Sequence, residues 1–140
     1  MTARGVKRAV ADAWAWLRYR FDKGPPHQRL GRLGERLAAN LLRAEGCRIV
    51  SRNQKISGHE VDIIAAEGDV LVFVEVKTRS GGGFGKPEEA VNRRRQKRLK
   101  AAGWMYLARL GRPASLRFDV VSVDFSRNPR GELTLIRNAF

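Results

Sequence analysis

The sequence contains little cysteine and histidine: one cysteine, Cys47, and two histidines in 140 residues. A lone cysteine excludes an internal disulfide and cannot build a zinc site by itself, so we expect Cys47 to be a small buried side chain at the start of a strand. Long apolar runs are also missing. None approaches the roughly 20 residues of a membrane-spanning helix, and the N-terminus lacks the apolar core and cleavage pattern of a secretory signal. The sequence therefore predicts a cytoplasmic protein without a transmembrane segment.

Acidic residues are scarce as well: 14 Asp and Glu stand against 28 Lys and Arg, which gives a net charge of +14. Such a charge attracts polyanions, and nucleic acid is the leading candidate. The same balance would also suit an anionic membrane surface, a ribosome or simple solubility, so it supports an assignment to nucleic acid without making it. The length fits a single domain, and a hydrophobic share of 43% is ordinary for a globular protein.

Some of these few acids lie inside apolar, strand-like runs. The motifs EVD at residues 60–62 and EVK at residues 75–77 interrupt segments that we interpret as strands from 60 to 65 and from 70 to 77. Because strand side chains alternate between faces, each motif puts its two charged residues on one face of its strand. The turn between the strands decides whether those faces coincide.

A two-residue hairpin loop at Gly68-Asp69 would place Asp62 opposite Glu75. The same register places Glu60 opposite Lys77. A loop longer by one residue on each side moves the partners but keeps all four charged residues on one face. The clustering of three acids and a lysine is therefore expected in either register.

Carboxylates held close together repel each other unless a cation or protons lie between them, and such hard oxygen ligands suit Mg²⁺ or Mn²⁺. A divalent metal beside a lysine is typical of phosphodiester hydrolysis, in which negative charge builds up on the phosphate. The alternative is a surface salt-bridge ladder in which Glu60 faces Lys77. That alternative accounts for the lysine but not for Asp62 opposite Glu75.

The order of an acid followed by Glu-x-Lys resembles the PD-(D/E)XK nuclease superfamily. More closely, the runs LGRLGERLAANLLRAEGCRIVSRNQ, GHEVDII and VLVFVEVKTRS, with the basic helix that begins PEEAV, resemble the YraN-type family of small bacterial nuclease-like proteins, which is related to archaeal Holliday junction resolvases. The resemblance covers roughly residues 30 to 140. It implies a restriction-endonuclease-like fold.

The resemblance also implies roles for individual residues. Asp62 and Glu75 would ligate the metal, Lys77 would position or activate the attacking water, and Glu35 would supply a further catalytic acid and metal ligand. Glu60 matches an additional acid of the family, also on the metal.

Two of the matching positions carry open questions. This chain has His59 where the family usually carries Gly, and that histidine would be a neutral spacer, a proton carrier or a phosphate contact. Glu35 lies on a predicted helix from about 28 to 45, at the border of its apolar stripe. Judged without the resemblance, Glu35 would be a solvated acid paired with Arg32 or Arg36.

The N-terminal arm, residues 1–28, is not explained by the resemblance. Its apolar residues recur at helical spacing, which predicts a basic amphipathic helix that ends at Gly24-Pro25-Pro26. These residues are Val6, Val10, Trp14, Leu17 and Phe21. One interpretation is contact with a membrane or the DNA backbone. The favoured one is that the Trp14 face docks on its own domain or on a second subunit.

A basic segment follows the EVK motif. The glycine-rich stretch 78–85 predicts a mobile loop, in which Arg79 would contact a phosphate and Phe84 would stack on or wedge against a base. The alternative is an ordinary flexible connector. Lys86-Pro87 is then expected to open a long helix. Its density of cations predicts phosphate contacts without sequence preference. The candidate nucleic-acid-binding residues are Arg79, Arg93, Arg94, Arg95, Lys97, Arg98 and Lys100.

The remaining elements complete an α/β domain over residues 29–140. Strands are expected at 47–52 and 53–58 before the motif hairpin, and at 116–123 and 132–137 after the basic helix. Asp119, in the first of the last two strands, is interpreted as structural and paired with a basic neighbour. The expected fold is thus a mixed central sheet flanked by helices, with the N-terminal amphipathic helix as an extra element.

We therefore expect a Mg²⁺- or Mn²⁺-dependent DNA endonuclease or resolvase-like hydrolase that acts on structured or branched DNA. The alternative is a non-catalytic nucleic-acid-binding protein that keeps the nuclease fold and acts in DNA repair, uptake or chromosome handling. An adaptor whose basic helix binds an acidic protein or a membrane is a third possibility. A homodimer is expected by analogy with resolvases, because a junction presents two strands to be cut.

Overall fold

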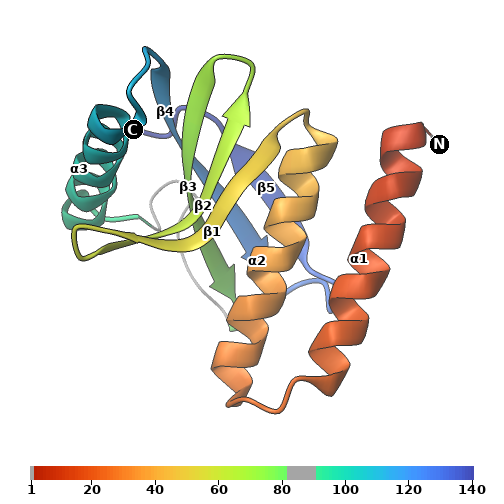
Figure 1. Ribbon diagram of the computed structural model, residues 1–140. Coiled ribbons are helices and arrows are strands. Elements are labelled where there is room, and N and C mark those ends of the chain that lie inside the picture. Colours follow the sequence, from red (N-terminus) through yellow and green to blue (C-terminus); the bar gives the residue numbers. More distant parts are fainter. Residues whose placement is uncertain (1, 82–90) are drawn as a thin grey trace.

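The computed structural model describes residues 2–81 and 91–140. Two helices come first, three strands follow, and a third helix precedes two further strands. The elements are α1 Ala3–Phe21, α2 Pro26–Ala44, β1 Arg48–Ile56, β2 His59–Glu67, β3 Val70–Arg79, α3 Arg93–Leu110, β4 Ser115–Asp124 and β5 Glu132–Ile136. In space they form layers: α1 lies outermost, α2 lies between α1 and the sheet, and α3 covers the opposite side (Figure 1).

The sheet has five strands in the order β1-β2-β3-β4-β5. Strands β3 and β4 pair in parallel, and every other neighbouring pair is antiparallel. A parallel pair needs a crossover connection, and α3 lies in that connection. The expected α/β domain with a mixed central sheet is confirmed.

Side chains that alternate along the strands pack in two separate hydrophobic cores, one on each face of the sheet. On one face Val72 and Val74 of β3 pack with Leu33 and Leu37 of α2. On the other face the ring of Phe73 packs in a cluster that includes residues of α3. The side-chain period of two in β3 therefore fixes which helix covers which face.

Helix α2 approaches the sheet closely at Gly34. A Cβ atom added there would lie 2.1 Å from the hydroxyl oxygen of Thr78 on β3, which is inside contact distance. Glycine thus allows the first half of α2 to lie against the end of β3. This approach also brings the neighbouring Glu35 towards the sheet.

The first strand differs from expectation. Residues 47–52 and 53–58 were expected to form two segments, but β1 runs without interruption from Arg48 to Ile56, with a register shift between Ile49 and Ser51. The irregularity absorbs an extra residue in the pairing with β2. A tight turn follows at Ser57 and Gly58, whose φ angles of 49° and 82° both lie in the left-handed region typical of hairpin turns.

Helix α3 begins later than expected. Its first residue is Arg93, and the side chain of Asn92 caps it by accepting a hydrogen bond from the backbone N–H of Arg95 at 2.9 Å. Val91 and Asn92 lie outside the helix, so the expected helix does not run through these two residues. The expected start itself, Lys86-Pro87, and Phe84 fall within residues 82–90, which lie outside the described residues. Arg79, placed in the expected loop, instead ends β3.

Helix α1 docks through a face that the sequence did not indicate. Ala15 is buried, and Trp16 and Tyr19 pack against the core that contains α2. The expected docking of the Trp14 face on its own domain is wrong, because the Trp14 side chain is 62% exposed. The ion pair of Asp22 with Arg32, at 2.7 Å, also ties the end of α1 to α2. No helix among the described residues is long and apolar enough to cross a membrane.

Candidate functional site

Strands β2 and β3 pair only near their hairpin. The turn has the predicted register, with Glu67 opposite Val70, and the pairing runs as far as Ile63 opposite Val74. Beyond that point β2 stays paired with β1, and β3 stays paired with β4. The two strands therefore separate at the positions of the charged motifs, and backbone groups there lose their partners across the sheet.

The side chain of Asp62 occupies the point of separation. Its Oδ2 accepts a hydrogen bond from the backbone N–H of Val76 at 2.8 Å, so the carboxylate replaces the missing backbone partner. Glu75 precedes Val76 and is only 5% exposed. By alternation along their strands, Asp62 lies on the face of Ile64 and Glu75 on the face of Phe73, which is one face of the sheet. The two acids therefore share a face as predicted, but their backbones are not paired opposite each other, because the pairing ends at Ile63 and Val74.

The environment of Asp62 shifts its ionisation. Burial, together with the negative charge of Glu75, raises the pKa of Asp62 from 3.8 to about 7. The hydrogen bond from Val76 opposes this shift but does not cancel it. A buried carboxyl held against a second carboxylate is a typical feature of sites that bind a cation or move a proton.

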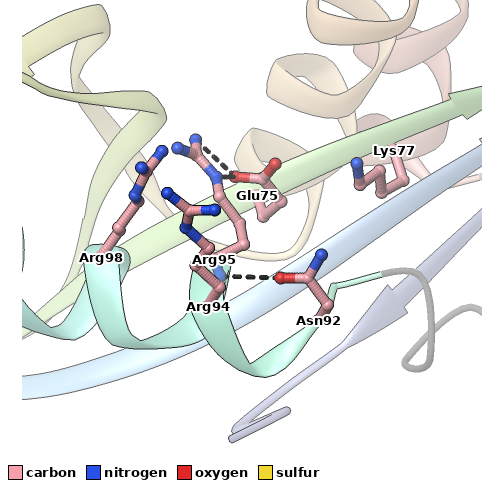
Figure 2. Close-up of a pocket in the computed structure, with 6 residues that line it drawn as sticks. All are labelled: Glu75, Lys77, Asn92, Arg94, Arg95 and Arg98. Carbon is pink, nitrogen blue, oxygen red and sulfur yellow. Dashed lines mark hydrogen bonds and ion pairs between the residues drawn. The ribbon is translucent and has the colours of Figure 1, made fainter.

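Arg95 of α3 reaches across to Glu75 (Figure 2). Its Nε donates to Glu75 Oε2 at 3.0 Å, and its Nη2 lies 2.9 Å from the same oxygen. The same Nη2 donates to the backbone carbonyl of Glu60 at 2.7 Å. Arg95 thus joins α3 to β2 and β3 at the acids, although we had expected it on a surface that contacts nucleic acid.

A pocket of about 430 Å³ opens beside Glu75. Figure 2 shows that its wall combines side chains from the end of β3 with side chains from the first turns of α3. The lining residues are Glu75, Lys77, Asn92, Arg94, Arg95 and Arg98. Four cations around one buried acid form a surface that attracts phosphate groups strongly.

The further acids lie around the pair. Glu35 is half-buried on α2, burial raises its pKa, and the side chain of Asn53 on β1 forms a hydrogen bond with it. The negative charge of Glu35 also contributes to the raised pKa of Asp62, so the carboxyl groups of Glu35 and Asp62 are neighbours. The alternative, an ion pair of Glu35 with Arg32 or Arg36, is not formed among the described residues. Arg32 pairs with Asp22, and Arg36 acts on Glu35 only as a nearby charge. Glu60 is exposed.

The donor set can be compared with the needs of a metal. Across residues 2–81 and 91–140, no three His, Cys, Asp or Glu side chains are gathered closely enough to hold an ion, so Glu35, Glu60, Asp62 and Glu75 do not form one ligand set. Asp62 and Glu75 alone fit Mg²⁺ or Mn²⁺, since Mg²⁺ commonly keeps several waters and uses only one or two carboxylates. A cation would also relieve their repulsion. Their role as ligands stays a prediction.

The other predicted side chains are spread along α3. Arg93, Arg94, Lys97, Arg98 and Lys100 are exposed, while Arg95 is half-buried. Lys77 is half-buried, and among the described residues no ion pair links it to Glu60, so the salt-bridge ladder is not formed.

His59 is the first residue of β2 and lies opposite Ile56, directly after the tight turn. Its suggested roles stay untested.

Asp119 is fully buried, away from this pocket. Arg117 binds its carboxylate at 2.9 Å, and the backbone N–H of Asn138 donates to the same carboxylate at 2.9 Å. The predicted pairing with a basic neighbour is confirmed, and Asp119 holds the C-terminal segment against β4.

Sequence reasoning missed two asparagines. Asn92 caps α3 and lines the pocket, and an Asn just before a basic helical run is a recognisable capping signal. Asn53 supports Glu35 from a strand position with a φ of 50°. Nothing in the local sequence marks Asn53, because its partner lies on another element.

Comparison with known proteins gives sequence relatives throughout the domain. Residues 34–123 match the family described as "Uncharacterised protein family UPF0102". The UPF0102 protein STH1475 of Symbiobacterium thermophilum is 49% identical over 114 residues, covering 81% of this chain and 97% of that relative. A UPF0102 protein of Pelotomaculum thermopropionicum is 44% identical over 113 residues, covering 79% and 94%.

Among solved structures, SfsA of Pyrococcus furiosus in complex with Ca²⁺ is similar at a TM-score of 0.33 and 12% identity. The similarity spans 79% of this chain and 63% of that one.

Proposed function

This chain belongs to the uncharacterised protein family UPF0102, and we propose that it is a metal-dependent endonuclease that hydrolyses phosphodiester bonds in structured or branched DNA. One observation carries the proposal: a half-buried Asp62 and a buried Glu75 lie where two strands separate, beside a pocket lined by cations. An acid pair alone would suit many sites. The adjacent cations narrow the choice to a phosphate-containing substrate.

The acids and the cations would divide the chemistry between them. Asp62 and Glu75 would hold Mg²⁺ or Mn²⁺, which when bound supplies polarisation of a phosphoryl oxygen and a water of lowered pKa. Lys77 lies beside Glu75 on the same face of β3 and would orient the attacking water or neutralise charge on the phosphate. Glu35, whose pKa is raised by burial, would accept a proton nearby.

The cations of α3 would hold the substrate. Arg94 and Arg98 are exposed and line the pocket, so each can contact a phosphate oxygen. Arg93, Lys97 and Lys100 extend the charge along the helix for neighbouring phosphates. This division supports the finer proposal of a restriction-endonuclease-like domain, in which acids at separating strands cut a backbone that is held by a flanking helix.

A second function has its own supporting observation. Arg95 already neutralises Glu75, as a cation would, which suits a nuclease fold that binds DNA without cutting it. Such a protein would act in DNA repair, uptake or chromosome handling. The two proposals differ in whether Asp62 matters: cleavage depends on Asp62, whereas binding by α3 does not.

The experiment is a cleavage assay on single-stranded, duplex, flapped and four-way-junction DNA with Mg²⁺ or Mn²⁺. We compare the variants Asp62→Asn and Lys77→Met with one matched control each. The controls are Asp69→Asn, in the hairpin loop, and Lys55→Met, on β1; both side chains are exposed. Cleavage that requires the metal and is lost only in the first two variants supports the endonuclease. Binding without cleavage on every substrate, unchanged by Asp62→Asn, supports the binding protein.

The oligomeric state belongs to the same proposal. A homodimer would present two sites to the two strands of a junction. The mass of the protein in solution, free and bound to a four-way junction, tests this directly.

A further inference from the structure

Helix α1 exposes a continuous apolar surface, which we call the outer stripe. Its residues are Val6 (49% exposed), Val10 (55%), Trp14 (62%), Leu17 (43%) and Phe21 (71%). At about 100° per residue these five side chains fall within an arc of about 80°, along the full length of the helix. Single exposed apolar residues are ordinary on protein surfaces, but a contiguous stripe with two large aromatic rings indicates contact with another apolar phase.

The outer stripe points away from the rest of the protein. Ala15 and Tyr19, on the opposite side of α1, make the contacts with the core. Figure 1 shows α1 as the outermost layer, with α2 between it and the sheet. Helix α1 therefore already packs on the domain through its other face. The outer stripe is a second apolar face, which the domain itself does not cover.

Positive charge borders the outer stripe on both sides. Lys7 and Arg18 follow one edge of the arc and Arg20 follows the other, and all three side chains are exposed. The acids of this region are already engaged. Asp12 pairs with Arg8 at 3.5 Å and accepts a hydrogen bond from Asn40, and Asp22 pairs with Arg32.

Charge decides which occupant fits. A second copy of the chain would bring two basic borders together, which costs energy by repulsion. A nucleic-acid backbone would satisfy the cations but leave the apolar rings in water. An anionic lipid surface satisfies both, because apolar side chains enter the boundary of the acyl chains while Lys and Arg reach the headgroups.

We propose that α1 is an interfacial anchor that seats the outer stripe in an anionic membrane surface. The helix would lie in the plane of the interface, and the protein would bind reversibly. Helix α3 lies on the other side of the sheet from α1 (Figure 1), and the pocket is lined by residues of α3 and by Glu75 and Lys77 of β3. The pocket would therefore face away from the lipid and stay open to a polyanion. Residues 34–123, which match the family, do not include α1, so this proposal goes beyond the proposed cleavage.

The test is flotation of the full chain with lipid vesicles. Vesicles of equal parts phosphatidylglycerol and phosphatidylcholine are compared with vesicles of phosphatidylcholine alone. Trp14→Glu is matched by Trp104→Glu on α3, because both tryptophans are 62% exposed on helices. We expect wild type and Trp104→Glu to float with the anionic vesicles only, and Trp14→Glu to lose partitioning by about tenfold or more.

A second measurement does not depend on the glutamate variant. Trp16→Phe with Trp104→Phe leaves Trp14 as the single tryptophan, since the chain has three. We expect its fluorescence to shift to the blue on anionic vesicles and to be quenched by lipids brominated on their acyl chains. Trp14 fluorescence that ignores the vesicles would overturn the proposal.

The competing occupants give different results. A wild-type dimer that Trp14→Glu splits into monomers, without vesicle binding, would overturn the proposal in favour of a second copy. Weaker DNA binding by Trp14→Glu, again without vesicle binding, would overturn it in favour of a nucleic-acid contact. Neither readout involves cleavage, so failure of the membrane proposal leaves the proposed hydrolysis to its own assay.

Discussion

Arg95 and Glu75 form an ion pair at 2.9 Å across the gap between α3 and β3, and the Glu75 side chain is 7% exposed while that of Arg95 is 26% exposed. The guanidinium supplies the cationic partner that a buried carboxylate requires. A metal on Glu75 would have to share that carboxylate with Arg95 or displace it. The pair therefore links the stability of the site to its proposed occupancy.

Replacing Arg95 by Met should destabilise the metal-free protein by about 2 kcal/mol, because Glu75 and Asp62 lose their neighbouring positive charge. Mn²⁺ should restore much of the loss by taking the place of the guanidinium. Thermal unfolding with and without Mn²⁺ measures both effects. Arg94→Met, one residue away and exposed, is the control and should change stability by less than about 0.5 kcal/mol. Equal losses in the two variants would contradict the ion-pair argument.

Ionisation of Asp62 should lower stability in the metal-free protein. Its pKa is 3.8 when unfolded and about 7 when folded, so the folded state binds the proton more tightly. The destabilisation is absent below about pH 4, grows as pH rises to about 7, and stays constant above that. Asp62→Asn should therefore raise the melting temperature at pH 8 and leave it nearly unchanged at pH 4.

Asp69→Asn, in the exposed hairpin turn, is the matched control and should show no such pH dependence. A carboxyl resonance of Asp62 that titrates near its ordinary pKa would remove the basis of this expectation.

The cations of α3 should set the salt dependence of DNA binding. Arg94→Gln with Arg98→Gln removes two exposed charges from the pocket, which should weaken binding on every sequence and reduce the slope of log affinity against log salt by about two. Titrations at several salt concentrations measure the slope. Arg127→Gln with Arg130→Gln, exposed charges before β5, keep the total charge equal and should leave the slope nearly unchanged.

Cys47 should react slowly with thiol reagents in the folded protein. Burial, together with the neighbouring Glu67, raises the pKa of its thiol to about 11; the thiol donates a hydrogen bond to Glu67 Oε2, with Sγ and Oε2 3.4 Å apart. At pH 8 the thiolate is therefore rare as well as shielded. Labelling with iodoacetamide should be much slower in native buffer than in denaturant. Equally fast labelling in both would contradict the packing of Cys47 under α2.

The hairpin shows how far the sequence alone could go. The two-residue loop at Gly68-Asp69 fixes the register, and the period of two then assigns Asp62 and Glu75 to one face. Both rules act over a few residues, so they hold before the rest of the chain is considered. The sequence could not indicate that β2 and β3 separate at these acids. The separation arises because β2 stays paired with β1 there while β3 stays paired with β4.

What the sequence determined by itself was local: helix and strand periods, the hairpin register, the common face of Asp62 and Glu75, and the basic helix. What the tertiary structure decided was which surfaces meet. Amphipathic spacing marks an apolar stripe on α1, but only the position of α2 shows that the helix packs through Ala15 and leaves Trp14 exposed. Arg94 and Arg95 are also alike in sequence, but their side chains point in different directions from α3, and only Arg95 reaches Glu75. Which of the two arginines points at Glu75 depends on how α3 is rotated against strands that are distant in sequence.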